Sequence, residues 1–301
     1  MKIILTGSTG QLGKTISLMK PKEITLIALS RKDLNLKDKE ACFEIVKELK
    51  PDWIINSAAY TAVDLAEDNI EEAYAINFEA PKQFAKALKL LGGNLLQIST
   101  DFVFDGNTNI PYLPTNKRNP INIYGKSKAE GEKIIEEILN DTNQSTILRT
   151  SWLMSPYGKN FASTILNLLR SREEISIVND QIGAPTSCNS LAKTCWSIIN
   201  YKINFENKEK LPGILHWSNL GKASWFDVAN FILKVSKEYN LISNDPIIKP
   251  INSSEYKVKA IRPKYSVLDS SISAEILNIE NISWEIAIRE ILYNKTFKNF
   301  S

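Results

Sequence analysis

Residues 2 to 13 read Lys-Ile-Ile-Leu-Thr-Gly-Ser-Thr-Gly-Gln-Leu-Gly, a short apolar run followed by three glycines, and a helical pattern comes next. Strand, glycine turn and helix in this order are the context in which glycines cradle a pyrophosphate at a helix N-terminus. The spacing is GxxGxxG and not GxGxxG, so the string alone is a weak signal. Its position between a strand and a helix leads us to interpret Gly7, Gly10 and Gly13 as a dinucleotide-binding turn.

Apolar, strand-like runs recur along the first half of the chain, with helical patterns between them. The runs lie at 24–29, 53–57, 95–99 and 146–148, and the helical patterns at 38–49, 71–91 and 124–139. This alternation predicts an α/β fold with a doubly wound parallel sheet. In such sheets, ligands bind at the carboxyl ends of the strands.

Polar or small residues stand where five successive strands are predicted to end. These are Gly7 to Gly13, Ser30-Arg31-Lys32, Ala58-Ala59-Tyr60-Thr61, Thr100-Asp101 and Thr150-Ser151-Trp152. Because the carboxyl ends of parallel strands share one edge of the sheet, we expect these groups to form a single crevice.

After residue 150 the alternation loosens, which predicts a second and smaller α/β lobe for the substrate. Helices are expected at 161–170, 191–201, 225–239 and 284–292, a hydrogen-bonding loop at 179–186, a solvated connection at 202–210 and an extended segment at 262–269. We assign residues 1–150 and about 186–222 to an NAD(P)-binding Rossmann domain. Residues about 151–185 and 223–301 then form a nucleotide-sugar-binding domain.

The composition excludes several classes of protein. The net charge is only +3, from 37 basic and 34 acidic residues, which gives no argument for nucleic acid or a membrane surface. Three cysteines without metal spacing suit a reducing cytosol. The single histidine, His216, excludes a histidine-rich metal centre, and we expect it to be packed or hydrogen-bonded. The chain shows neither a signal peptide nor an apolar run of about 20 residues, so we expect a cytoplasmic protein.

Tyr124 and Lys128 are candidates for the chemistry. A spacing of four residues puts both side chains on one face of a helix. A free phenol has a pKa of about 10, and a fixed ammonium beside it favours the phenolate and lowers that pKa. The pair would therefore act as a general acid and base on a hydroxyl or a carbonyl. Taken alone, such a pair is more often an ordinary feature of a helix surface.

Seven strings in one order carry a resemblance to a known family. They are Gly7-Ser-Thr-Gly-Gln-Leu-Gly13, Ala58-Ala-Tyr-Thr-Ala-Val-Asp64, Ser99-Thr-Asp-Phe-Val-Phe104, Tyr124-Gly-Lys-Ser-Lys128, Arg149-Thr-Ser-Trp152, Asn179-Asp-Gln-Ile-Gly-Ala-Pro-Thr186 and Arg262-Pro263. With them the chain resembles the extended short-chain dehydrogenase/reductases, and among these the dTDP-4-dehydrorhamnose reductase family. The resemblance covers nearly the whole chain.

The resemblance implies reduction of the C4 ketone of dTDP-4-dehydro-L-rhamnose by NAD(P)H. Tyr124 resembles the proton donor, and Lys128 the residue that lowers its pKa and hydrogen-bonds the nicotinamide ribose. Thr100 resembles the residue that polarises the ketone or tunes Tyr124. A strand-end hydroxyl that caps the next turn is the alternative for Thr100.

The implied binding residues fall into two sets. The cofactor set is Gly7, Gly10, Gln11, Leu12, Gly13, Ser30, Arg31, Asn35, Leu36, Ala58, Ala59, Tyr60, Thr61, Tyr124 and Lys128. The substrate set is Thr100, Asp101, Trp152, Asp180 and Gln181. Arg31 and Lys32 carry cations where NAD-selecting enzymes place an acid, so we expect NADPH to be preferred and NADH to remain usable. Alternatively, these cations are solvated, Trp152 is a core residue, and Asn160 simply caps a helix.

Three departures from the family pattern have consequences. Phe102 stands where many relatives have Tyr, which removes a possible hydroxyl contact to the substrate. Asn35 stands where relatives often carry Asp near the adenine. Some relatives bind Mg²⁺ between subunits through glutamates, and in register those positions are Thr15 and Asn189 here. Since Mg²⁺ prefers carboxylates, we expect no metal and a monomer or weak homodimer.

Two other functions remain open. The first is a nucleotide-sugar epimerase or 4,6-dehydratase of the same fold, but dehydratases follow the strand-end Thr with Asp-Glu, and here Phe102 follows Asp101. The second is a non-catalytic regulatory subunit, like the NADP-binding beta subunit of methionine adenosyltransferase. The presence of Thr100, Tyr124 and Lys128 favours chemistry over regulation.

Overall fold

The computed structural model describes residues 1–140, 142–204 and 210–293. The strands are β1 (Lys2–Thr6), β2 (Thr25–Leu29), β3 (Trp53–Asn56), β4 (Asn94–Thr100), β5 (Ser145–Thr150), β6 (Leu153–Met154), β7 (Glu174–Val178), β8 (Ile182–Gly183), β9 (Thr186–Ser187), β10 (Ile214–His216), β11 (Ala223–Ser224) and β12 (Ile247–Ile251). The helices are α1 (Gln11–Leu18), α2 (Lys39–Leu49), α3 (Val63–Ala66), α4 (Ile70–Tyr74), α5 (Ala80–Leu91), α6 (Ile123–Leu139), α7 (Phe161–Ser171), α8 (Cys188–Asn204), α9 (Trp225–Glu238), α10 (Ser271–Leu277) and α11 (Trp284–Tyr293). A π-helical turn η1 (Ala75–Glu79) and two 3₁₀ turns, η2 (Asp101–Val103) and η3 (Ser253–Glu255), complete the set.

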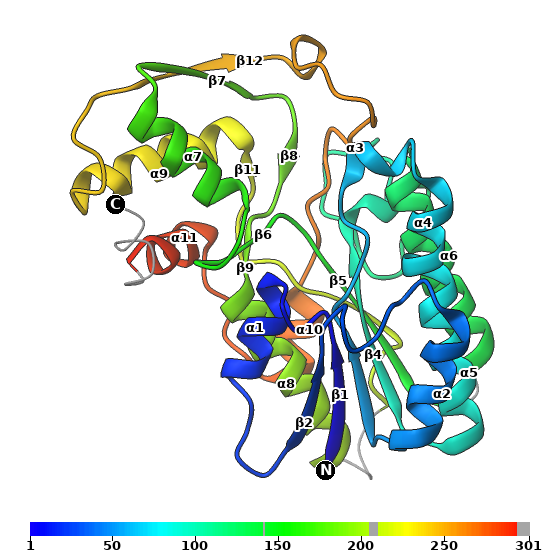
Figure 1. Ribbon diagram of the computed structural model, residues 1–301. Helices are drawn as coiled ribbons and strands as arrows, with labels where there is room; N and C mark the ends of the chain where they lie inside the picture. Colours follow the sequence, from blue (N-terminus) through cyan, green and yellow to red (C-terminus); the bar gives the residue numbers. More distant parts are fainter. Residues whose placement is uncertain (141, 205–209, 294–301) are drawn as a thin grey trace.

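The main body is a six-stranded sheet in the order β10-β5-β4-β3-β1-β2, and every neighbouring pair is parallel. Figure 1 shows helices on both faces of this sheet. The predicted α/β class with a doubly wound parallel sheet is therefore confirmed. From β2 the chain crosses over β1 to β3, so the strand order reverses between β1 and β3, which is where such sheets open a crevice.

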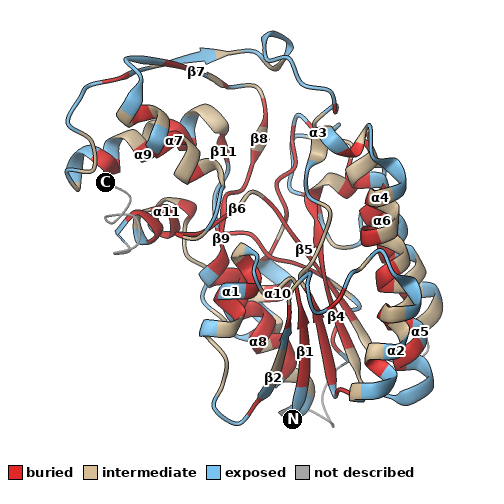
Figure 2. Cartoon of the chain, in the orientation of Figure 1, coloured by how far each residue is buried: buried red, intermediate tan, exposed pale blue. Residues whose placement is uncertain are grey.

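Each central strand contributes to two hydrophobic cores. In β1, Ile3 and Leu5 pack with α1, α8 and α10, whereas Ile4 packs with α2, α5 and α6 on the opposite face. Because side chains alternate across a strand, a continuous apolar run buries both faces at once. Figure 2 shows the central strands as almost wholly buried.

A second lobe lies beside the carboxyl edge of the sheet, above it in Figure 1. Its core joins α7, α9 and α11 to the parallel pair β7–β12. Helix α10, by contrast, packs through Leu277 against α8, on the face of the sheet that α1 and α8 cover. The division of the chain into two domains with the boundaries given above stays a prediction.

The helix expected at 71–91 differs from the structure, because it is split into α4, the π-turn η1 and α5. Pro81 lies in the first turn of α5 and has no N–H to donate to the carbonyl of Asn77, four residues earlier. The wider π-turn absorbs this defect. It also turns that carbonyl towards α6, where a Cβ on Gly131 would lie 2.1 Å from it.

The remaining expected helices are present, with ends shifted by a few residues. Helix α8 continues to Asn204, so the connection expected at 202–210 begins later than predicted. Its residues 205–209 lie outside the described part of the chain. Among the described helices, none combines the length and apolarity that crossing a bilayer requires.

Candidate active site

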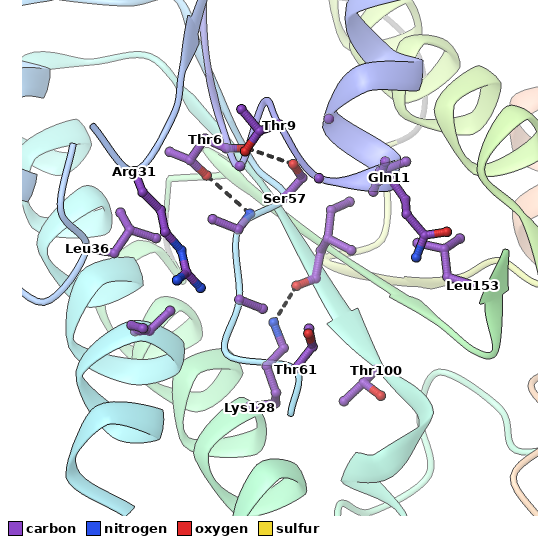
Figure 3. A pocket seen from close by; sticks show the side chains of 18 of the residues that line it. Thr6, Thr9, Gln11, Arg31, Leu36, Ser57, Thr61, Thr100, Lys128 and Leu153 are labelled. Atoms are coloured by element: carbon purple, nitrogen blue, oxygen red, sulfur yellow. Dashed lines mark hydrogen bonds between the residues drawn. The ribbon is translucent and has the colours of Figure 1, made fainter. Parts of the chain in front are cut away.

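A cavity of about 650 Å³ lies at the carboxyl edge of the sheet. Figure 3 shows Arg31 and Gln11 entering it from different sides, with Lys128 and Thr100 lower in the same view. Most of the predicted site residues line it: Gly7, Gly10, Gln11, Leu12, Gly13, Ser30, Arg31, Asn35, Leu36, Ala58, Ala59, Thr61, Thr100, Asp101, Tyr124, Lys128 and Trp152. The expectation that the strand ends form one crevice is therefore confirmed.

The glycine turn is built for a close approach of backbone. Gly7 has φ of +68°, and a Cβ there would lie 2.8 Å from the backbone nitrogen of Ala58. A Cβ on Gly13 would lie 2.2 Å from the carbonyl oxygen of Gly7, so α1 can start this close only with glycine. The first N–H groups of α1 are left facing the crevice, where they can receive an anion.

The end of β2 carries cations towards the crevice. Arg31 is exposed and lines the cavity. The nearest acid in sequence, Asp33, is held back, because the backbone N–H and the hydroxyl of Ser30 both donate to its carboxylate, at 2.8 and 2.6 Å. These hydrogen bonds lower the pKa of Asp33. The carboxylate therefore serves as a turn cap.

The start of α6 is fastened to the end of β4. Asn122 caps the helix by accepting from the N–H of Gly125 at 2.8 Å. A Cβ on Gly125 would lie 2.2 Å from the carbonyl oxygen of Phe102, so glycine allows the helix to begin directly against turn η2. The ring of Phe102 meets that of Tyr124 edge to face, at 5.6 Å between centroids. Tyr124 is thereby brought to the crevice beside Thr100.

The expected lowering of the Tyr124 pKa is wrong for this structure. Burial raises it to about 12, and the charge of Asp101 acts in the same direction, while a hydrogen bond with Thr100 opposes both. The ammonium of Lys128 is directed elsewhere, since it donates to the carbonyl oxygen of Ile98 at 2.7 Å (Figure 3). Desolvation of the phenolate is therefore the dominant effect, and the opposing hydrogen bond with Thr100 is weaker.

Lys128 is itself buried, and burial lowers its pKa to about 8, against an opposing effect of Glu132. Glu132 is the centre of an ionic network beneath the site. Arg149 binds it through Nε and Nη2, Arg118 donates at 3.0 Å, and Ser99 donates at 2.5 Å. The cations and these hydrogen bonds hold the pKa of Glu132 below its usual value despite burial.

His216 is fully buried at the margin of this network. One ring nitrogen lies 3.0 Å from the carbonyl oxygen of Tyr112 and the other 3.3 Å from Arg149. Burial and the charge of Arg149 lower its pKa to about 3. The prediction of a packed, hydrogen-bonded imidazole is confirmed.

The hydroxyl of Thr100 is engaged locally. It accepts from the N–H of Phe102 at 3.1 Å and donates to Oδ1 of Asp101 at 3.0 Å, as the capping alternative predicts. Burial raises the pKa of Asp101 to about 6, while hydrogen bonds with Ser266 and Thr100 oppose the rise. Within the described residues, Oδ2 of Asp101 has no partner with good hydrogen-bond geometry, although the residue lines the cavity. A buried oxygen left in this state is a site for a ligand donor.

Trp152 lies between β5 and β6, lines the cavity and is half-buried. Its ring stacks on that of Trp225, at 3.4 Å between centroids and 4° between planes. It lines the cavity and also packs against the core of the lobe, so the core alternative holds, and contact of Trp152 with the substrate stays a prediction.

Three of the predicted binding residues are not among those that line this cavity: Tyr60, Asp180 and Gln181. The N–H of Tyr60 donates to the side chain of Asn77. Asp180 accepts from the N–H and the hydroxyl of Ser253, both at 2.8 Å, which ties η3 to the second lobe. Their predicted roles as ligand contacts have no geometric support here.

Asn160 caps α7 in a capping box with Ser163. Its Nδ2 also donates to Oε1 of Gln11 at 2.9 Å, and Ser155 donates to the same oxygen. The turn after β6 is thus attached to the glycine turn, and it adds Gly158 and Lys159 to the lining. The sequence carried no recognised signal for these two residues, because only the folded chain brings them to Gln11.

The positions compared with magnesium ligands lie apart from any such arrangement. Thr15 is buried and its hydroxyl donates to the carbonyl of Gln11, while Asn189 is exposed on α8. Within the described residues, no three or more His, Cys, Asp or Glu side chains cluster as a metal site would require. Whether the protein binds a metal stays a prediction.

Comparisons with known proteins agree with this geometry. The family model described as RmlD substrate binding domain matches residues 1–297. The dTDP-4-dehydrorhamnose reductase of Aggregatibacter actinomycetemcomitans is 34% identical over 292 residues, which cover 96% of this chain and 98% of that protein. The crystal structure of a dTDP-4-dehydrorhamnose reductase from Clostridium acetobutylicum has a TM-score of 0.87 at 34% identity, with 97% and 98% of the two chains covered. That of the Bacillus anthracis enzyme in complex with NADP has a TM-score of 0.85 at 36% identity and the same coverage.

Proposed function

The chain belongs to the RmlD substrate binding domain family, and from that membership we propose that it is a dTDP-4-dehydrorhamnose reductase. The reaction is reduction of the C4 ketone of dTDP-4-dehydro-L-rhamnose to dTDP-L-rhamnose with NADPH. The observation that carries this proposal is the meeting of Thr100, Tyr124 and Lys128 in the same cavity as the glycine turn. A proton donor and a dinucleotide site in one crevice are what reduction of a carbonyl requires.

The residues present fit a dinucleotide. The backbone of the glycine turn comes closer to Ala58 and to the start of α1 than any Cβ would allow. The start of α1 then offers unpaired N–H groups to a pyrophosphate. When bound, NADPH supplies the hydride that reduces the ketone. Arg31, at the end of β2, is at the adenosine end of such a site, where a guanidinium can bind a 2′-phosphate bidentately. We therefore propose NADPH as the preferred cofactor and NADH as an accepted one.

The side chains then divide the work on the ketone. Tyr124 carries the proton that passes to the carbonyl oxygen, and its raised pKa keeps it protonated at neutral pH. Thr100 offers a hydroxyl to the same oxygen, and Lys128 stabilises the phenolate as it forms. Asp101, with a buried oxygen that lacks a partner among the described residues, accepts from a hydroxyl of the sugar.

The surroundings of Tyr124 disfavour the dehydratase alternative. Where a dehydratase has its second acid, Phe102 packs its ring against Tyr124 at 5.6 Å. An apolar ring in that position cannot move a proton, so elimination of water lacks an acid–base pair. The non-catalytic alternative predicts cofactor binding without turnover, which the assay below distinguishes.

We also propose a cytoplasmic location and a monomer or weak homodimer. Cys42, Cys188 and Cys195 are free and buried, which suits a reducing compartment. The lack of carboxylates at Thr15 and Asn189 supports the absence of a metal-bridged dimer.

The test is oxidation of NADPH by the wild-type protein in the presence of the keto-sugar, followed at the nicotinamide absorbance, with Tyr124→Phe as the matched variant. Loss of a general acid lowers kcat by roughly 10²–10⁴-fold, while NADPH affinity should stay unchanged because the aromatic ring remains. Turnover by the phenylalanine variant near the wild-type rate would exclude Tyr124 as the donor. Cofactor binding without any wild-type turnover would favour the regulatory alternative.

A further inference from the structure

Three residues spaced four apart lie along one side of α6 and meet the end of β4: Tyr124, Lys128 and Glu132. The ammonium of Lys128 donates to the carbonyl oxygen of Ile98 at 2.7 Å. The next strand residue, Ser99, donates its hydroxyl to Oε1 of Glu132 at 2.5 Å. Thr100 follows and lies within hydrogen-bonding reach of Tyr124. Consecutive residues of β4 are thus attached to successive turns of α6.

The carboxylate of Glu132 is held from two strands at once. Ser99 and Arg149 are partners in the β4–β5 ladder, so their side chains leave the same face of the sheet. Arg149 donates through Nε to Oε1 at 2.9 Å and through Nη2 to Oε2 at 2.6 Å. All three side chains are buried. Because both carboxylate oxygens are engaged, Glu132 cannot move along the sheet without losing a hydrogen bond.

Stability alone does not account for a buried network at this place. Replacing a buried ion pair by apolar residues of similar volume is often neutral or stabilising, and α6 already packs on the sheet through Ile135 and Leu139. Apolar contacts have no preferred direction, whereas hydrogen bonds have a defined geometry. Only the network therefore prevents α6 from sliding on β4. A slide by one residue would move Tyr124 by about 1.5 Å.

We propose that Ser99 and Glu132 are positioning residues, whose hydrogen bond fixes α6 on β4 so that Tyr124 meets the ketone oxygen beside Thr100. This inference rests on the proposed function. Although Ser99 lines the cavity, its hydroxyl is directed at Glu132. Both residues therefore act through Tyr124, and a displacement of about 1 Å at a reacting group can lower a rate by about a hundredfold.

Glu132 also acts on the charge of Lys128. Its carboxylate raises the pKa of Lys128, against the effect of burial. The other ionisable groups around the network are Tyr124 and Glu136 on α6, Asp101 after β4, Arg149 on β5, His216 on β10 and Arg118 in the loop before α6. A neutral residue at 132 would remove the attraction and leave the Arg149 charge uncompensated. Both changes disfavour the ammonium form of Lys128.

The experiment compares Ser99→Ala and Glu132→Gln with the wild type, and adds Ser99→Ala to a Tyr124→Phe background. Ser99→Ala removes one hydrogen bond and leaves the ion pairs of Glu132 in place, so this variant should fold. Glu136→Gln is the matched control, because Glu136 binds Arg118 on the same helix and, among the described residues, forms no hydrogen bond with β4.

The NADPH assay gives kcat and the KM of the keto-sugar across the pH range around the pKa of Lys128. Calorimetry gives the dissociation constants of NADPH and of dTDP, and urea unfolding verifies that each variant is folded. Ser99→Ala should lower kcat by roughly ten- to a hundredfold, because Tyr124 is no longer fixed. The KM of the sugar and the affinities for NADPH and dTDP should stay within about twofold of the wild type.

The double variant and the pH profile separate positioning from general damage. In the Tyr124→Phe background, Ser99→Ala should change kcat by less than about twofold, since the group to be positioned is gone. Glu132→Gln should lower kcat and move the alkaline decline of kcat/KM to lower pH, whereas Ser99→Ala should leave that decline in place. Glu136→Gln should behave as the wild type.

A folded Ser99→Ala variant with wild-type kcat would overturn the positioning role. An equal loss of kcat in the Tyr124→Phe background would do the same, as would a parallel loss of NADPH affinity, since either indicates damage to the whole crevice. An unmoved alkaline decline in Glu132→Gln would remove its action on Lys128, and Ser99→Ala decides the positioning role if Glu132→Gln fails to fold. If the wild type binds NADPH but does not reduce the keto-sugar, the proposed function itself fails and the positioning role fails with it.

Discussion

Replacing Glu132 by Gln should destabilise the protein far more than the same change at Glu136, one helical turn further along α6. The side chains of Glu132 and Arg149 are each 1% exposed, and their closest contact is 2.6 Å. Gln keeps the shape of Glu132 but leaves the buried guanidinium without a countercharge. Breaking a buried ion pair from one side typically costs about 3–5 kcal/mol. Glu136 is 36% exposed and binds Arg118 alone, so its loss should cost about 0–1 kcal/mol.

The assay is urea unfolding of both variants and the wild type at neutral pH, followed by fluorescence and circular dichroism. The free energies of unfolding of the two variants should differ by at least about 2 kcal/mol. Glu132→Gln should unfold at a lower urea concentration, with a similar slope of free energy against urea. Its pH dependence has a defined sign. The pKa of Glu132 is lowered in the folded protein, so its contribution is complete above the unfolded value of about 4.3. The contribution is then lost as the pH falls through the folded value.

Equal stabilities of Glu132→Gln and Glu136→Gln would refute the reasoning, because burial would then have no effect on the cost of a lost carboxylate. A second variant tests whether the unpaired charge causes the loss of stability. Replacing Glu132 and Arg149 together by Leu and Met removes both buried charges and should recover part of the loss. Failure of the double variant to gain stability over Glu132→Gln would mean that packing, and not the unpaired charge, determines the cost.

Three further changes have defined outcomes. Arg31→Asp should reverse the preference from NADPH to NADH, chiefly through KM and by roughly ten- to a hundredfold, and an unchanged kcat/KM ratio would exclude Arg31 as the phosphate reader. Since burial lowers the pKa of Lys128 to about 8, kcat/KM should decline as the pH rises through that value, and a flat profile up to about pH 10 would contradict this. Thr146→Val should raise the free energy of unfolding by about 1 kcal/mol, because the buried hydroxyl has no partner among the described residues, and a loss measured by urea unfolding would contradict this.

Local patterns were sufficient to predict the sheet and one edge of the site. The run from Ile3 to Leu5 buries both faces of a strand, and the same pattern marks every other central strand. Once the strands are known to be parallel, their carboxyl ends must lie together, so residues as distant as Gly7 and Thr100 could be assigned to one crevice. This deduction requires the order of elements along the chain but none of their exact contacts.

Contacts between residues far apart in the chain could not be predicted in this way. Trp152 contacts Gly183 and Trp225, which are 31 and 73 positions away, and Gln11 meets Asn160 across 149 positions. Asp180 illustrates the converse case, because its motif suggests a ligand contact while its carboxylate is used by Ser253. A motif identifies which residues matter to a family but does not distinguish a group that touches the ligand from one that fixes a loop.

The error over Tyr124 shows which physical effect the sequence conceals. Spacing along a helix reveals that a cation is near the phenol, but desolvation depends on everything packed around the ring, and here it raises the pKa from 10.0 to about 12. The raised value suits the direction of the proposed reaction. A group that protonates a carbonyl oxygen must hold its proton until hydride arrives, and a phenolate at rest would be the wrong form. The cation of Lys128 is then most useful late, when the proton has left and negative charge has developed on the phenol oxygen. Burial therefore acts before the proton transfer, by keeping the phenol protonated, and the cation acts after it.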